Sequence, residues 1–142
     1  MLSLRVLCTL IHWVQVVQAQ EMGKLETFGA DGKLYSSDPD EYYLLSRQSY
    51  GTEDSSGFSG RIRIKKNYAG GGYEILLRDY TARCFAPFDK LVEVTVREVG
   101  KDEFNNNDMV EITSPERFPG AAKKHAYNLY WAACHNRFQR FK

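Results

Sequence analysis

The stretch RIRIKKNYAGGGYEILLRDY, residues 61–80, decides the fold class of this chain. Its first five residues alternate basic and apolar side chains, a period of two that is typical of a strand with one buried face. A glycine-rich connection follows over residues 67–72, and residues 73–80 form a second strand-like run. We therefore predict that the two strands form an antiparallel hairpin.

The segments on either side of this hairpin also predict strands. Residues 91–99 alternate, with three valines on one face, and residues 105–108 predict a turn before a short strand at 109–113. Residues 24–36 predict another hairpin, because Asp31-Gly32 is a strong turn pair. Residues 52–59, rich in glycine, serine and acids, predict a surface loop.

Residues 38–50 allow two interpretations. Asp38 and Pro39 are typical of a helix start. The run Tyr42-Tyr43-Leu44-Leu45 is instead typical of a strand. We favour the strand, because the neighbouring segments predict strands.

The C-terminal segment changes period and predicts an amphipathic helix that begins after Pro119-Gly120. Its apolar residues recur at steps of three and four and form one stripe: Ala126, Leu129, Tyr130, Ala133, Cys134, Phe138 and Phe141. We therefore expect a mainly β or α+β fold. The architecture would be an antiparallel β-sandwich or open barrel of five to seven strands with one C-terminal helix.

The N-terminal residues 1–19 predict a secretory signal peptide. Arg5 precedes an apolar stretch that ends in the small-x-small pattern Val17-Gln18-Ala19. No segment approaches the eighteen apolar residues of a membrane span. We therefore expect a secreted, extracellular protein whose residues 20–142 form a single β-rich domain.

Cleavage after Ala19 would leave two cysteines, Cys84 and Cys134. In an oxidising compartment an even pair predicts a disulfide. Cys134 lies on the apolar stripe of the helix and Cys84 follows a predicted strand, so the bond would join helix to sheet. Two free thiols or an intermolecular bond are the alternatives.

Basic side chains form a candidate ligand-binding stripe. Arg61, Arg63 and Lys65 share one side of their strand, and we expect Arg78 and Arg97 on the same side of neighbouring strands. Such a stripe is suited to a sulfated glycan or another anionic surface.

The alternative is an ordinary solvated sheet face, on which Glu74 and Glu93 would be the cross-strand partners of the basic residues. Charge is uneven along the chain: residues 21–60 hold eight acids and three bases, and residues 61–142 hold ten acids and fifteen bases. We interpret these halves as complementary within one fold, which the solvated face would fit better than a dedicated polyanion site.

The loop Ala69-Gly70-Gly71-Gly72 is a second candidate contact site, since Tyr68 and Tyr73 flank it. Aromatic rings beside a flexible loop can stack on sugars or fill a partner's pocket. The alternative is a plain hairpin connection.

No catalytic or metal-binding constellation emerges. His125 and His135 would lie too far apart on one helix to share a metal, and Cys134 does not face the adjacent His135. Turn and capping chemistry explains the clustered acids better than a calcium loop does: Asp31, Asp38, Asp40 and Glu41. We expect no cofactor, no metal and no nucleic-acid partner.

These observations favour a secreted, non-enzymatic binding protein, with an extracellular protein or a glycan, sulfated or neutral, as its ligand. A carrier for a small apolar ligand is the alternative, because many Tyr and Phe are available to line a cavity. A secreted hydrolase is a weaker alternative, because histidines are scarce.

Overall fold

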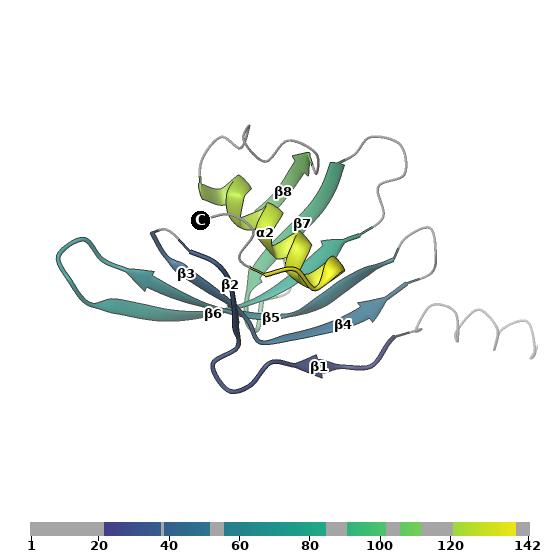
Figure 1. Cartoon of the computed structure of the whole chain (residues 1–142), viewed down its shortest axis with the longest axis horizontal. Coiled ribbons are helices and arrows are strands. Elements are labelled where there is room, and N and C mark those ends of the chain that lie inside the picture. The colour runs from purple at the N-terminus through teal and green to yellow at the C-terminus, as the bar shows by residue number, and fades with distance from the viewer. Residues whose placement is uncertain are drawn as a thin grey trace, which may run out of the picture.

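A computed structural model of the chain describes residues 22–37, 39–51, 56–84, 91–101, 106–111 and 121–138. The described strands form one antiparallel sheet, and helix α2 (Ala121–His135) lies across one face of it (Figure 1). The strands are β1 (Glu26–Thr27), β2 (Lys33–Ser36), β3 (Glu41–Leu44), β4 (Ser46–Tyr50), β5 (Gly57–Asn67), β6 (Tyr73–Arg83), β7 (Leu91–Glu98) and β8 (Asn106–Glu111).

The predicted fold class is confirmed. Seven of the described strands have four residues or more, and β1 adds a two-residue pairing at one edge. The order β1-β4-β5-β6-β7-β8 runs from one edge to the other without closing, and β3 lies between β2 and β5. The structure is therefore an open sheet with one C-terminal helix. No helix in the described ranges has the length and apolar character to cross a membrane.

The β5–β6 hairpin is the longest element and organises the sheet. Its pairing is continuous from Gly57↔Arg83 to Asn67↔Tyr73. At the tip the Gly71 amide donates to the Tyr68 carbonyl at 3.1 Å, and Gly71 adopts a φ of 97° that favours glycine. The hairpin prediction is confirmed, but β5 begins inside the predicted loop 52–59 and β6 continues beyond residue 80.

Residues 24–36 do not form the predicted hairpin. β1 pairs with β4 and β2 pairs with β3, so the two strands follow each other along one edge instead of pairing together. Residues 28–32 form the connection between β1 and β2, in which Gly32 has a φ of 83°. The Asp-Gly turn therefore exists, but the longer strand beside it offers both segments partners.

The segment 38–50 is extended, as favoured, over the residues that the structure describes; Asp38 lies outside them. β3 and β4 follow one another along β5 and are separated by Leu45, whose amide donates to the Arg61 carbonyl at 2.9 Å. β4 approaches β5 closely at this junction. A Cβ added to Gly60 would lie 2.1 Å from the Ser46 carbonyl oxygen, so the crossing requires glycine.

The C-terminal half follows the predicted order with shifted boundaries. β7 spans Leu91–Glu98, and Val94 lies buried on the face that carries the helix. β8 spans Asn106–Glu111, so the asparagines expected to turn the chain belong to the strand. Pairing with β7 supplies the backbone partners that a turn would have supplied. Residue 105 and residues 112–113 lie outside the described part.

The core lies between α2 and the inner face of the sheet. The helix is buried over more than the single predicted stripe, because Tyr127, Asn128 and Ala132 are buried in addition to four stripe residues, Ala126, Leu129, Tyr130 and Ala133. Cys134 and Phe138 of the stripe are partly buried, and Phe141 lies outside the described residues. The Asn128 amide reaches the Ser36 hydroxyl at 3.0 Å, which satisfies a polar group in this core. The sheet contributes Tyr35, Leu44, Ile62, Tyr80, Ala82 and Val94 to the same cluster.

Two contacts attach the end of α2 to the sheet. The Cys84 and Cys134 sulfurs lie 2.00 Å apart, which is bonding distance and fits the predicted disulfide. Arg47 of β4 donates through a terminal guanidinium nitrogen to the carbonyls of Ala132 and Ala133, at 3.1 and 3.4 Å. Carbonyls in the last turn of a helix have no partner within the helix, so Arg47 acts as its cap.

We predict that Cys134→Ser lowers the free energy of unfolding by about 4 kcal/mol, because the disulfide closes a loop of about 50 residues in the unfolded chain. Urea unfolding under non-reducing conditions measures this loss. Addition of a reductant should reduce wild-type stability to the level of the variant and leave the variant unchanged. Equal stability of oxidised wild type and variant would contradict the bond.

We predict that Gly60→Ala destabilises the fold by about 1–3 kcal/mol, since the new methyl group would collide with the β4 backbone. Gly70→Ala is the matched control: nothing lies within 4 Å of its added Cβ. Its effect should stay within about 0.5 kcal/mol. Thermal unfolding of both variants checks the difference, and equal melting temperatures would refute the close crossing.

Candidate functional site

The outer face of the β5–β6 hairpin collects the exposed apolar and aromatic side chains of the described sheet. The hairpin extends past α2 into solvent (Figure 1). On β6, Tyr73, Ile75 and Leu77 are 60%, 42% and 41% exposed, and Tyr68 at the tip is 47% exposed. Because they alternate along the strand, the three β6 side chains share one face.

The basic stripe of β5 lies beside these apolar side chains. Lys65 is the register partner of Ile75, and Arg63 is the register partner of Leu77. Directly opposed residues of an antiparallel pair point to the same side of the sheet. The hairpin surface, as we call it, therefore consists of Arg63, Lys65, Tyr73, Ile75 and Leu77. Tyr68 lies at the tip beside it and donates a hydrogen bond to Glu74.

The cations of this face are held by neighbours. The Lys65 ammonium lies 3.7 Å from Glu41 and 4.6 Å from the centre of the Tyr73 ring. The Arg63 guanidinium donates to the Asp31 carbonyl at 2.9 Å. It also stacks over the Tyr43 ring at 4.2 Å. These contacts order the basic groups and neutralise part of their charge.

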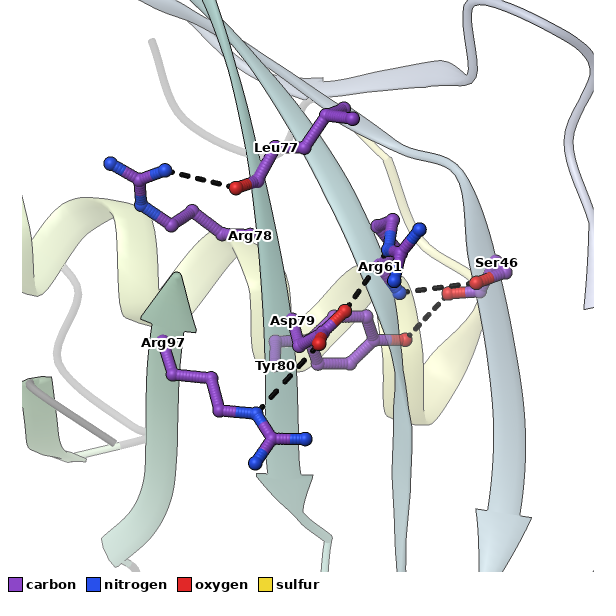
Figure 2. A network of polar contacts seen from close by, with 7 residues as sticks. All are labelled: Ser46, Arg61, Leu77, Arg78, Asp79, Tyr80 and Arg97. Carbon is purple, nitrogen blue, oxygen red and sulfur yellow. Dashed lines mark hydrogen bonds and ion pairs between the residues drawn. The ribbon is translucent and has the colours of Figure 1, made fainter. Parts of the chain in front are cut away.

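Arg61 lies further along the same face and converges with Arg97 on one carboxylate. Asp79 accepts from Arg61 at 3.0 Å and lies 3.7 Å from Arg97, as Figure 2 shows. The expectation that Arg97 shares the face of Arg61 is therefore confirmed. Asp79 serves both arginines, so this part of the stripe resembles a paired sheet face more than an open anion site.

Arg78 does not belong to the stripe, contrary to our prediction. Its register partner on β5 is Ile62, a core residue, which places Arg78 on the inner face. The predicted glutamate partners were also wrong. Glu74 accepts a hydrogen bond from Tyr68, and Glu93 lies opposite Arg83. Register, which the sequence pattern does not specify, decides these pairings.

The backbone edge of β6 beside the hairpin surface is unpaired in the part of the chain that the structure describes. β7 pairs with β6 only between Arg78 and Arg83. Within the described residues no strand pairs with the outer edge of Tyr73–Leu77. An unpaired strand edge is a template on which an extended segment can add.

Tyr68 and Tyr43 keep their protons over the physiological range. The hydrogen bond to Glu74 raises the pKa of Tyr68, and the bond to Glu41 raises the pKa of Tyr43. In return, the Tyr43 hydroxyl lowers the pKa of Glu41. These two phenols are therefore neutral and lie beside charged groups, an arrangement suited to binding.

The two helix histidines lie in separate clusters. His125 is buried, with its Nε2 atom 2.6 Å from the Tyr35 hydroxyl and its ring stacked on Tyr42 at 4.0 Å. Burial lowers its pKa to about 4 and raises the pKa of Tyr35. His135 instead contacts Tyr130 at 2.8 Å. Among the described residues, no three metal-ligating side chains gather in one place.

Sequence analysis singled out Arg63, Lys65, Tyr68 and Tyr73 as candidates but did not single out Ile75 and Leu77, the apolar residues beside them. The signal was present: Tyr73-x-Ile75-x-Leu77 alternates at the same period as the basic stripe on the facing strand. Such alternation normally marks a buried face, so its exposure becomes evident only when the position of the helix is known.

Comparison with known proteins adds no relative. No protein-family model matches the chain, and no curated protein or solved structure matches it significantly.

We predict that His125 makes the fold sensitive to mild acid. Its pKa is about 4 in the folded protein and about 6.5 when unfolded. The neutral form is therefore favoured by folding, and stability is lost as the pH falls from 6.5 towards 4. Between pH 7.5 and pH 5.0 the loss should be about 2 kcal/mol.

Urea unfolding at the two pH values measures this loss. His125→Gln keeps a hydrogen-bonding nitrogen for Tyr35 but does not titrate, so it should remove most of the pH dependence. His135→Gln, at a partly exposed site, should retain it. An identical pH dependence in wild type and His125→Gln would contradict the assignment.

Proposed function

We propose that this chain is a secreted, non-enzymatic binding protein that engages an extracellular protein through the hairpin surface. One observation carries the proposal: Tyr73, Ile75 and Leu77 are exposed together on a hairpin that projects from the body of the fold. Contiguous apolar side chains rimmed by polar groups are typical of protein interaction sites.

The open edge of β6 supports a particular mode of binding. An extended segment of the partner would add beside Tyr73–Leu77 and form main-chain hydrogen bonds. Its alternate side chains would then cover Ile75 and its neighbours on the outer face. Arg63 and Lys65, already ordered by Tyr43 and Glu41, would form a polar rim at low entropic cost.

The same contacts favour a protein over a sulfated glycan. A sulfated chain needs cations whose charge is available, whereas Asp79 serves Arg61 and Glu41 serves Lys65. Extracellular location remains part of the proposal. Its support is the predicted signal peptide at residues 1–19 and a Cys84–Cys134 pair at bonding distance.

The test begins with the native extracellular fluid and ends with a purified partner. A photo-crosslinker placed at residue 75 should capture one protein, and a crosslinker at residue 101, distant in sequence, should not. The dissociation constant of that protein is then measured for wild type and for the double variant Ile75→Thr, Leu77→Thr. We expect at least about a tenfold loss of affinity, since a few well-packed anchor residues carry most of the energy of an interface.

Two comparisons make the result specific. Arg61→Gln, on the same face but outside the hairpin surface, should bind like wild type. A glycan array at two salt concentrations tests the other ligand class. Two results together would overturn the proposal. The first is salt-sensitive binding of sulfated glycans that is lost in Arg63→Gln or Lys65→Gln. The second is that the double variant Ile75→Thr, Leu77→Thr binds the captured protein as tightly as wild type does.

A further inference from the structure

A pocket on the other side of the sheet is independent of the hairpin surface. It lies where α2 begins over the inner face of β5, β6 and β7, and has a volume of about 410 Å³. This volume falls within the range of sites that hold small organic molecules. Ala122 of the first helical turn lies on one side of the pocket and strand residues lie on the other.

The wall of the pocket is apolar and aromatic. Ile64 and Val96 are partly buried side chains that pack against the core. The Tyr42 and His125 rings stack with their centroids 4.0 Å apart, so both present a closely packed aromatic surface. The Nε2 atom of His125 is already bonded to Tyr35, and the burial-lowered pKa keeps this ring neutral above mildly acidic pH.

Arg78 lies at this wall and has no acidic partner among the described residues. Arg78 donates to the Leu77 carbonyl at 2.9 Å, and no carboxylate of the described residues lies within 4.0 Å of its guanidinium. Arg97 also lines the pocket but is paired with Asp79. Figure 2 shows Arg78 pointing away from the group around Asp79.

The helix start, and not an excess of side-chain charge, favours an anion here. Arg97 is paired with Asp79, so the remaining charges of the lining, Arg78 and Glu98, balance. The first turn of α2 carries no acidic residue, so the partial positive charge of the helix start is not offset there. A guanidinium beside an apolar wall is suited to a carboxylate, which it binds through two parallel hydrogen bonds.

We propose that this pocket binds a small amphipathic monocarboxylate, with its apolar body against Tyr42, Val96 and His125 and its carboxylate on Arg78. Glu98, the register partner of Arg78, sets the selectivity. It repels a second negative charge, and so disfavours dicarboxylates and phosphate esters. The site adds a small-molecule carrier role that does not depend on the protein-binding surface of the hairpin.

The test compares three probes of the same shape on the disulfide-intact protein: 4-phenylbutyrate, 4-phenylbutanol and 4-phenylbutylamine. Calorimetric titration should show binding of the carboxylate, with the alcohol weaker by about tenfold and the amine weaker still. Tighter binding of the amine, abolished by Glu98→Gln, would overturn the proposal. So would the absence of carboxylate binding at about 10 mM.

Matched variants assign the contact. Arg78→Gln should weaken the binding of 4-phenylbutyrate by at least about tenfold. Arg61 lies on the opposite face of the sheet, so Arg61→Gln should leave the affinity unchanged. Val96→Phe fills the pocket while keeping Arg78, and should abolish binding. Equal losses in Arg78→Gln and Arg61→Gln would indicate unspecific charge attraction. Unchanged binding in Val96→Phe would place the probe elsewhere, and either result refutes the site.

Discussion

The register between β5 and β6 is the constraint on which the rest of the structure depends. Eleven consecutive residue pairs fix it, from Gly57↔Arg83 to Asn67↔Tyr73. A slip of one residue would exchange the two faces of the strand. It would place Arg61 against the helix and Ile62 in water. The core, the exposed hairpin surface and the position of Arg78 therefore all follow from one hydrogen-bond ladder.

The two faces have different physical characters because only one carries the helix. On the inner face, α2 covers Ile62, Tyr80 and Val94 and excludes water from them. On the outer face, the side chains form ion pairs and cation–ring contacts at the solvent boundary, such as the contact between Arg63 and Tyr43. Beside the first turn of the helix the inner face also becomes accessible, and there Arg78 replaces the apolar residues of the core. Charged side chains therefore occupy the inner face where the helix no longer covers it.

Local sequence patterns predicted the elements that depend on local periodicity. The alternation at 61–65, the valines of 91–99 and the helical stripe of 121–135 each carry their own signal. Pairing partners depend on residues distant in sequence, and there the prediction was wrong. Asp31-Gly32 makes a turn without a hairpin, and Glu41 rather than Glu74 neutralises Lys65. The candidate site was half predicted for the same reason. Its basic and aromatic residues were evident, whereas the exposure of Ile75 and Leu77 depends on which face of the sheet the helix covers.

The bond between Cys84 and Cys134 also changes what a cut in the chain would do. It joins the end of β6 to the last turn of α2, so β7, β8 and most of the helix lie within a covalent ring. A protease that cleaved any one peptide bond between these cysteines would leave a single molecule, with the helix still tethered to the sheet. Only a second cut within the ring, or reduction of the bond, would release a fragment. In the extracellular location that we propose, a single cut by a protease would therefore damage the backbone without removing the helix that covers the core.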